Sequence, residues 1–295
     1  MFNFINTDLA VEIHESYSGN NVEIDGVEIF RERNESGNIR MTRVAIKSEE
    51  SARKMNKPEG LYITLDCINK ANIYEEMNDA LYTVLFKMLQ RYRKKQILVA
   101  GLGNPYATPD SLGPDTVSKV NATRHLINIY GKDFQNKNNM FNVATVIPGV
   151  LIQTGMESVD IIKSLVKENN IGLVIVIDAL SARMVKRLSS TIQITNTGIN
   201  PGKGVGNNRS PINKKVLGCD VIAIGVPTVI DMTTIVSDIM GDYEYIEEAK
   251  YYEFMMKKIK ELEKDKLYVT SKDIDEEIAK MSEVIAMVLN KVFGF

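Results

Sequence analysis

Gln96-Ile-Leu-Val-Ala-Gly-Leu-Gly103 is a short, continuous apolar stretch that ends in glycine, and it decides the fold. Such a stretch is typical of a strand that is covered on both faces. Leu173-Val-Ile-Val-Ile177 has the same character and is the most apolar strand candidate of the chain. Because strands buried on both faces occur mainly in parallel sheets flanked by helices, the sequence predicts an α/β protein with a mostly parallel sheet.

Outward from Gln96, expected helices and strands alternate along the chain. A helix over residues 74–94 precedes this strand, with apolar side chains three and four residues apart and a basic C-terminal end. Strands separated by helices of this length favour a three-layer α/β/α sandwich. The other expected helices cover residues 116–130 and 158–168, and the other expected strands cover residues 143–147, 191–195 and 221–224.

The two ends of the chain extend this core. Residues 22–66 are strand-like, and the turn signal Asn34-Glu-Ser-Gly37 predicts a hairpin. The last expected helix begins at the capping sequence Thr270-Ser-Lys-Asp273. Since the sequence shows no internal repeat or low-complexity linker, we expect a single domain. It covers residues 1–295, with a β-rich elaboration at 20–70, the α/β core at 96–240 and C-terminal helices at 242–295.

Composition argues against several classes of protein. Thirty-six basic residues against 38 acidic ones give a net charge of −2, which argues against direct nucleic-acid binding. The sequence contains neither the ~18 consecutive apolar residues of a membrane helix nor a secretory signal, so we expect a cytoplasmic protein without a membrane partner. Two cysteines and two histidines leave little material for a disulfide framework, a zinc site or a catalytic triad.

The first loop that could carry chemistry follows the strand at Gln96. Ligands of open parallel sheets bind outside the carboxyl ends of the strands, and this loop contains Gly103, Asn104 and Asp110. It lacks the third glycine of a dinucleotide fingerprint and the Gly-Lys-Ser/Thr of a P-loop, which argues against phosphate binding. We interpret Asp110 as a catalytic candidate, and Gly103 and Asn104 as candidates for substrate binding or oxyanion stabilisation.

The second position is Asp178, which directly follows the strand at residues 173–177. A buried carboxylate is costly unless it has a partner, and Arg183 is one candidate for a purely structural pair. The functional interpretation is that Asp110 and Asp178 share a proton. The charged carboxylate would then act as a base on water while the protonated one polarises a peptide carbonyl.

The third position is a glycine-rich loop over residues 196–209. Glycines allow the backbone to approach a ligand closely and can present amide groups to a developing oxyanion. Gly198, Lys203, Gly204 and Arg209 are therefore candidates for the substrate cleft, and Arg183, which follows the strand of Asp178, is a further candidate for it. Asn196-Thr-Gly198 is similar to the Asp-Thr/Ser-Gly signature of pepsin-like proteases but lacks the carboxylate.

Other nucleophiles and bases are weaker candidates. His14 and His125 are the two histidines, and His125 falls within an expected helix. Ser181 and Cys219 have no evident base beside them in the sequence.

Stretches spread over nearly the whole chain resemble one known family, the germination proteases. The resemblance implies an atypical aspartic endopeptidase of the spore core that degrades small acid-soluble spore proteins. It also implies a zymogen, a homo-tetramer, no metal cofactor, and catalytic aspartates at Asp110 and Asp178. Asn196 departs from the pattern, because an acid is expected there. The stretches are Thr7–Glu12, Gly101–Asn104, Thr108–Pro114, Thr123–Leu126, Pro148–Leu151, Ile177–Arg183, Thr191–Ile194, Pro201–Asn207 and Ile224–Val229.

Two alternatives remain open at this point. The glycine loop followed by two strand-end acids is also similar to hydrogenase maturation endopeptidases, which bind nickel through equivalent acids and a histidine. With two histidines in the chain, a metal-dependent peptidase of that kind is the less favoured interpretation. A non-catalytic protein that binds a small molecule in the loop at Gly101–Gly113 is the alternative from another class.

The N-terminal Asp8-Leu9-Ala10 looks like a substrate carried in the enzyme's own chain. Germination proteases resemble one another in cutting after an acid that precedes a hydrophobic residue and alanine. We therefore expect cleavage between Asp8 and Leu9, with residues 1–8 as a propeptide. The structural alternative is that Thr7–Glu12 forms an N-terminal strand.

Overall fold

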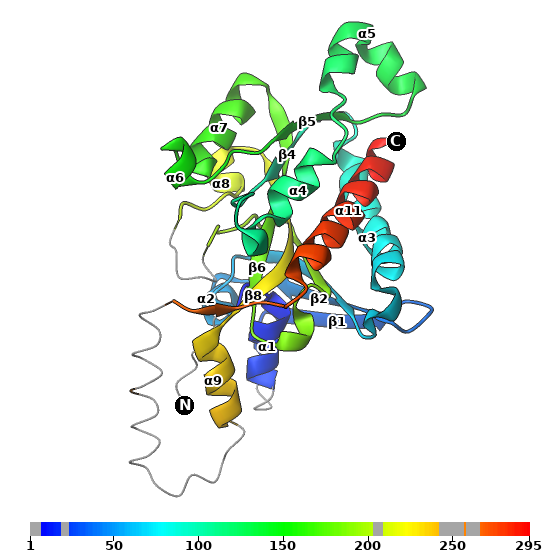
Figure 1. Ribbon diagram of the computed structural model, residues 1–295. Coiled ribbons are helices and arrows are strands. Elements are labelled where there is room, and N and C mark those ends of the chain that lie inside the picture. The colour runs from blue at the N-terminus through cyan, green and yellow to red at the C-terminus, as the bar shows by residue number, and fades with distance from the viewer. Residues whose placement is uncertain (1–6, 19–23, 203–208, 242–256, 258–265) are drawn as a thin grey trace, which may run out of the picture.

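The computed structural model of the protein describes residues 7–18, 24–202, 209–241, 257 and 266–295 (Figure 1). Within these residues the strands form one nine-stranded sheet in the order β1-β2-β3-β7-β8-β6-β4-β5, with β9 paired to β8. The strands are β1 Val27–Arg33, β2 Ile39–Ile46, β3 Gly60–Cys67, β4 Gln96–Gly101, β5 Asn142–Val146, β6 Ile171–Ala182, β7 Thr191–Thr195, β8 Asp220–Asp231 and β9 Tyr268–Val269.

One half of the sheet is parallel and the other half is antiparallel. The strands β5, β4, β6 and β8 run parallel to one another. From β8 outward, β7, β3, β2 and β1 pair antiparallel in turn. The α/β class is thus confirmed, and the expected β-rich elaboration, hairpin included, is the antiparallel continuation of the same sheet.

Helices cover both faces of the sheet, which gives the expected three layers (Figure 1). On one face α3, α4 and α11 pack against β4, β6 and β7 in the largest apolar core. On the other face α7 and α8 pack against β4 and β6. These helices are α3 Ile73–Leu89, α4 Leu112–Ser118, α7 Ser158–Glu168, α8 Lys214–Leu217 and α11 Ile274–Phe293.

The N-terminal segment forms a helix, α1 Ala10–Ser18, so the strand alternative for this segment is wrong. Ala10 packs with Val44 and Tyr62 of the antiparallel half and with Met55 of α2, which covers Glu49–Met55. Tertiary packing against this otherwise bare sheet face is the physical reason why the helix forms. The expected propeptide, residues 1–8, lies outside the described residues except for Thr7 and Asp8.

The expected helix over residues 116–130 is two helices. The helix α4 ends at Ser118 and α5 covers Arg124–Lys137. Between them, the Thr123 hydroxyl donates to Phe141 O at 2.5 Å and accepts from Val143 N at 2.8 Å. These bonds tie the connection to β5 and interrupt the helical hydrogen bonds. The prediction of one continuous helix was wrong because it rested on apolar spacing alone.

The C-terminal part contains α11 with its expected buried face, including Ile278, Met281 and Ile285. Its expected cap was wrong: Asp273 makes no side-chain capping bond, and Thr270 donates its hydroxyl to Thr228 O at 2.7 Å. The remaining helices are α6 Leu151–Thr154 and α9 Met232–Gly241. No helix within the described residues is long and apolar enough to cross a membrane.

Candidate active site

Asp178 lies inside β6 rather than after it. The strand continues to Ala182 because β8 pairs with it from Leu173 to Ala182, placing Asp178 opposite Gly225. On the other side β4 pairs only as far as Gly101, opposite Ile177. Asp178 is therefore the first residue of β6 that projects past the end of β4, at the carboxyl edge of the parallel strands.

Asp110 is held next to this edge by the loop that follows β4. It ends a 3-10 turn, Thr108–Asp110, and its carboxylate Oδ2 accepts a hydrogen bond from Asn104 N at 2.8 Å. Gly103 has φ of 113°, and a Cβ atom on it would stand 1.9 Å from Asp110 O. Glycine is needed at this position because the two ends of the loop approach so closely. The expected ligand-binding glycine and asparagine thus act first as supports of Asp110.

A cavity of about 400 Å³ brings the predicted catalytic residues together. Its lining includes Asp110, Asp178, Gly103 and Arg209. Gly198 lines an adjoining cavity instead. Lys203 and Gly204 lie outside the described residues.

The two carboxyl groups favour protonation more than ordinary aspartates do. Burial raises the pKa of Asp178 well above its usual range, and the negative charges of Asp110 and Asp8 raise it further. Burial also raises the pKa of Asp110, against the opposing effects of Asn104 N–H and Arg209. Because each carboxyl resists ionisation and their charges interact, one shared proton is favoured over two charges.

Asp8 is the third carboxyl group of the cavity, and its position there was not predicted. Its backbone N donates to Ser181 O at 2.8 Å and its Oδ2 accepts from Ser181 N at 3.0 Å. Lys57 Nζ and Gln193 Nε2 donate to its backbone oxygen at 2.9 and 3.0 Å. The residue before the expected cut therefore lies along β6, three positions from Asp178. Leu9 is fully buried beside Leu180.

Arg183, expected as a candidate for the substrate cleft, is not among the residues that line the cavity. The backbone N of Arg183 donates to Glu12 Oε2 at 2.6 Å. Asn196 has a structural contact, because its Oδ1 accepts from Leu61 N at 2.9 Å.

Lys266, Tyr268 and Ser181 are among the lining residues that were not predicted as site residues. Lys266 and Tyr268 enter the cavity from the C-terminal segment around β9, and a strand of two residues leaves no periodic signal in the sequence. Ser181, considered above only as a nucleophile without a base, lines the cavity with a buried hydroxyl that has no hydrogen-bond partner in the described part of the chain.

Histidine and cysteine lie away from this cavity. Neither His14 nor His125 is among its lining residues. Cys219 is buried in the core beneath α7 and α8, where burial raises the pKa of its thiol to about 11. Among the described residues, no group of three or more histidine, cysteine, aspartate or glutamate side chains could hold a metal ion.

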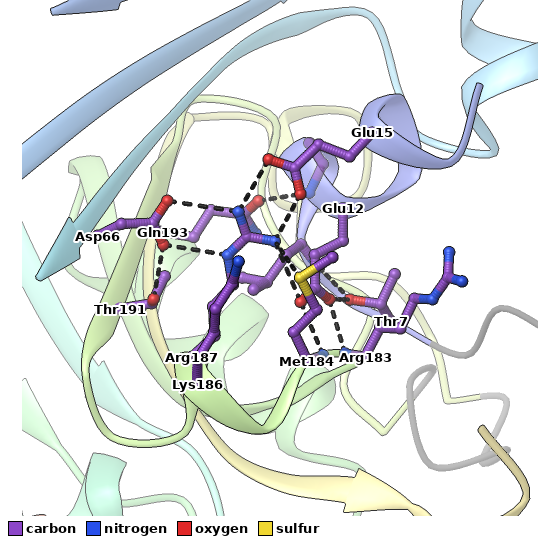
Figure 2. A network of polar contacts seen from close by, with 12 residues as sticks. Thr7, Glu12, Glu15, Asp66, Arg183, Met184, Lys186, Arg187, Thr191 and Gln193 are labelled. Carbon is purple, nitrogen blue, oxygen red and sulfur yellow. Dashed lines mark hydrogen bonds and ion pairs between the residues drawn. The ribbon is translucent and has the colours of Figure 1, made fainter. Parts of the chain in front are cut away.

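A buried polar network anchors the segment that follows Asp8 (Figure 2). Arg187 forms ion pairs with Glu12, Glu15 and Asp66 at 3.2, 2.8 and 3.1 Å. Glu12 also accepts hydrogen bonds from the Thr7 hydroxyl and from Met184 N. This network fixes α1 against the end of β6, and so holds Asp8 in the cavity.

The germination protease family model matches residues 5–247 of the chain. A germination protease of Clostridium perfringens (strain ATCC 13124) is 40% identical over 312 residues, covering 98% of this chain and 95% of that protein. The chain belongs to the germination protease family. It is therefore a protease associated with spore germination. Germination proteases of Caldanaerobacter subterraneus subsp. tengcongensis and Priestia megaterium are 44% and 40% identical, each covering 79% of this chain. The match covers 72% of the first protein and 65% of the second.

Among solved structures, a NiFe hydrogenase maturation protease, HycI from Thermococcus kodakarensis KOD1, is similar to this germination protease. The match covers 70% of this chain and 98% of that one, with 14% identity and a TM-score of 0.36. A similarity this low supports no statement about function.

Proposed function

We propose that this germination protease is an aspartic-type endopeptidase that cuts small acid-soluble spore proteins with water activated between Asp110 and Asp178. The observation that carries the proposal is the meeting of these two carboxyl groups with Asp8, a substrate-like residue, in one cavity. A peptide carbonyl beside Asp8 is then within the same site as a potential base and a potential acid. Neither a histidine nor a cysteine lines that site.

The two aspartates have different environments, which assigns their roles. Asp178 has the more strongly raised pKa, because it is deeply buried beside two other carboxyl groups, so it carries the proton. Asp110 accepts a hydrogen bond from Asn104 N and lies near Arg209, and both favour its ionised form. Asp178 then polarises the scissile carbonyl while Asp110 takes a proton from water, in the manner of carboxyl pairs that share one proton.

The rest of the cavity serves to hold substrate. Arg209 supplies positive charge near both aspartates, and Ser181 offers its backbone N–H to an acidic side chain, as it does to Asp8. The loop around Gly198, which lines the adjoining cavity, belongs to the cleft in this proposal. Lys203 and Gly204, also expected there, lie outside the described residues. From the family resemblance, we also propose that the protein forms a homo-tetramer and acts in the spore core.

The proposal also includes self-processing of a zymogen. Water would cleave the amide between Asp8 and Leu9, leaving a carboxylate on Asp8 and an amino group on Leu9. Support comes from the position of Asp8 beside Asp178. The Asp8 backbone oxygen accepts hydrogen bonds from Lys57 and Gln193 in this state, so the cut requires that this carbonyl turn toward Asp178. In this state the uncut segment occupies part of the cavity that a substrate would need.

The test of the catalytic pair is a cycle of Asp110→Asn, Asp178→Asn and the double variant. Each single variant should lose at least about a hundredfold in kcat, because an acid or a base is missing. The double variant should be little worse than either single one, because a pair with one shared proton works as a unit.

Asp160→Asn on the exposed part of α7 is the matched control and should keep full activity. Either single variant with wild-type kcat would remove that residue from the mechanism. Inactivation by a reagent that labels Ser181 would favour a nucleophilic serine instead, and loss of activity with a chelator, restored by metal, would favour the metal-dependent alternative.

Self-processing is tested by N-terminal sequencing after incubation at mildly acidic pH. The new terminus should be Leu9, and it should not appear in Asp178→Asn. Lower pH should speed the cut, because bringing the pair to its singly protonated state requires uptake of a proton wherever both groups are ionised. A preparation that gains activity while Met1 remains its terminus would disprove this route of activation.

A further inference from the structure

The network around Arg187 has an excess of buried negative charge (Figure 2). One guanidinium, 4% exposed, is shared among the carboxylates of Glu12, Glu15 and Asp66. Arg187 binds Glu15 through two hydrogen bonds of 2.8 and 3.0 Å, and it binds Glu12 at the longer distance of 3.2 Å. The Glu12 side chain is fully buried. Since buried carboxylates are costly without cations, this group of side chains is suited to accept a second positive charge.

The Thr7 hydroxyl connects Glu12 to the backbone nitrogen of Leu9. It donates to Glu12 Oε2 at 2.5 Å and accepts from Leu9 N at 3.1 Å. Leu9 is the residue before α1, and Glu12 is the third residue of that helix. In this arrangement a glutamate side chain can reach back to the nitrogen of the capping residue, as in a capping box. In the uncut chain, the Thr7 hydroxyl lies between the Glu12 carboxylate and Leu9 N.

We propose that Glu12 is the binding site of the α-ammonium group that cleavage after Asp8 creates on Leu9. This inference rests on the proposed self-processing. Hydrolysis turns the neutral Leu9 amide into an ammonium group, and departure of Thr7 removes the hydroxyl that separates it from Glu12. A small turn at the start of α1 then brings the ammonium onto Oε2, where it supplies the second cation of the network.

The ion pair between the Leu9 ammonium and Glu12 would keep the start of α1 in place after residues 1–8 have been released. Glu12 also accepts from the backbone N of Arg183 and Met184, which directly follow β6. The same carboxylate thus ties the new chain end to the strand that carries Asp178 and Ser181. Leu9 stays packed against Leu180, Ala182, Leu188 and Ile230. Residues 1–8 would leave the cavity, while the end of β6 that lines it keeps its position.

The experiment compares chains whose N-terminus is made by an external protease that removes a folded fusion partner. One chain begins at Leu9 and the other carries one additional glycine before Leu9, which displaces the ammonium by about 3.8 Å. Both are made with Glu12 and with Glu12→Gln. Thermal unfolding gives the stability of each, and acylation of the α-amino group at pH 7 reports its protonation.

With Glu12 present, the extra glycine should lower Tm by several degrees and should speed acylation about tenfold or more. The reason is that pairing with a carboxylate raises the pKa of an α-amino group above its usual value of about 7.7–8.0, and each unit leaves about tenfold less neutral amine. In the Glu12→Gln chains the glycine should have little effect on either measurement.

Equal effects of the glycine in both backgrounds, or none in either, would overturn the ion pair, as would a Leu9 chain that does not unfold cooperatively. Self-processing is judged separately. A full-length protein that never cuts itself would contradict the proposed activation. The comparison of the Leu9 chains would still test the ion pair with Glu12, because an external protease makes their N-terminus.

Discussion

Asp178 shows at the scale of a single residue how a buried carboxyl group costs stability. The carboxyl is almost fully buried, and it accepts a hydrogen bond from Ala179 N at 3.0 Å. A carboxylate in such a place loses most of its hydration and lies beside Asp110 and Asp8. The folded state therefore holds the proton more tightly than the unfolded chain does, which suits a general acid and costs stability wherever the proton is lost.

Asp178→Asn should therefore abolish activity and stabilise the protein at neutral and alkaline pH. A raised folded-state pKa means that the wild type is most stable relative to the variant below the unfolded pKa of about 3.9. This stability is lost as pH rises through the folded pKa. Asparagine does not titrate and can keep the bond from Ala179 N.

We expect a gain of about 1–3 kcal/mol for the variant at pH 8, shrinking toward pH 4, in unfolding curves recorded across that range. Asp160→Asn is the control and should show no such trend. A variant that is less stable than wild type at pH 8 would mean that the Asp178 carboxylate is stabilised by contacts other than those described.

The residue scale also shows what the sequence could predict about the site. Asp110 and Asp178 were chosen as candidates because Asp110 lies in the loop after one apolar strand and Asp178 directly follows the apolar stretch of another, where parallel sheets bind ligands. The structure brings both to one cavity. Lys266 and Tyr268 were missed, since they approach from a segment far along the chain whose two-residue strand has no periodicity. Asp8 was recognised by its neighbours in sequence, but only tertiary packing of α1 places it in the cavity.

At the scale of elements, the site depends on the close packing of α4 against the ends of β4 and β6. Gly113 begins this contact: a Cβ atom there would lie 2.2 Å from Leu102 O and 2.5 Å from Ile177 O. Both neighbours are backbone atoms, one in β6 and one directly after β4, so they cannot turn aside as a flexible side chain can. The position of α4 also sets that of the loop bearing Asp110.

Gly113→Ala should cost more than about 3 kcal/mol, because the added methyl group forces helix and strands apart. Gly218→Ala is the matched control, since Gly218 has φ of 76° and no atom within 4 Å of the added carbon. Its cost should be about 1–2 kcal/mol, from the left-handed backbone alone. Urea unfolding measures the free energy of unfolding of both variants. If Gly113→Ala loses no more stability than Gly218→Ala, α4 can move away from the strands at little cost.

Elements were predicted best where local pattern and tertiary packing agree. The helix at Ser158–Glu168 and the strand at Thr191–Thr195 have the expected bounds. The strands β6 and β8 run further than expected, because they pair with each other beyond their apolar stretches, through Asp178 and Pro227. The segment at 7–12 was ambiguous in sequence, and packing against the antiparallel half of the sheet made it helical after Leu9.

At the scale of the whole molecule, one mixed sheet joins a catalytic half to a half that carries the N-terminal segment. The parallel strands supply the carboxyl edge with Asp178, and the antiparallel strands β2 and β3 supply the surface on which α1 rests. Arg187 joins the two, because it pairs with Glu12 and Glu15 of α1 and with Asp66 of β3. This joining explains how a chain end comes to lie in the enzyme's own cavity.

The central claim is that the carboxyl pair hydrolyses peptide bonds that follow an acidic residue. The most direct measurement is to incubate the purified protein, processed to its active form, with a small acid-soluble spore protein and to map every cut by mass spectrometry. Asp110→Asn and Asp178→Asn, given the same N-terminus, run beside it. We predict cuts after an acid that precedes a hydrophobic residue and alanine, the order of Asp8-Leu9-Ala10, and no cuts with either variant. Cuts at unrelated sequences, or the same cuts made by either variant, would contradict the account.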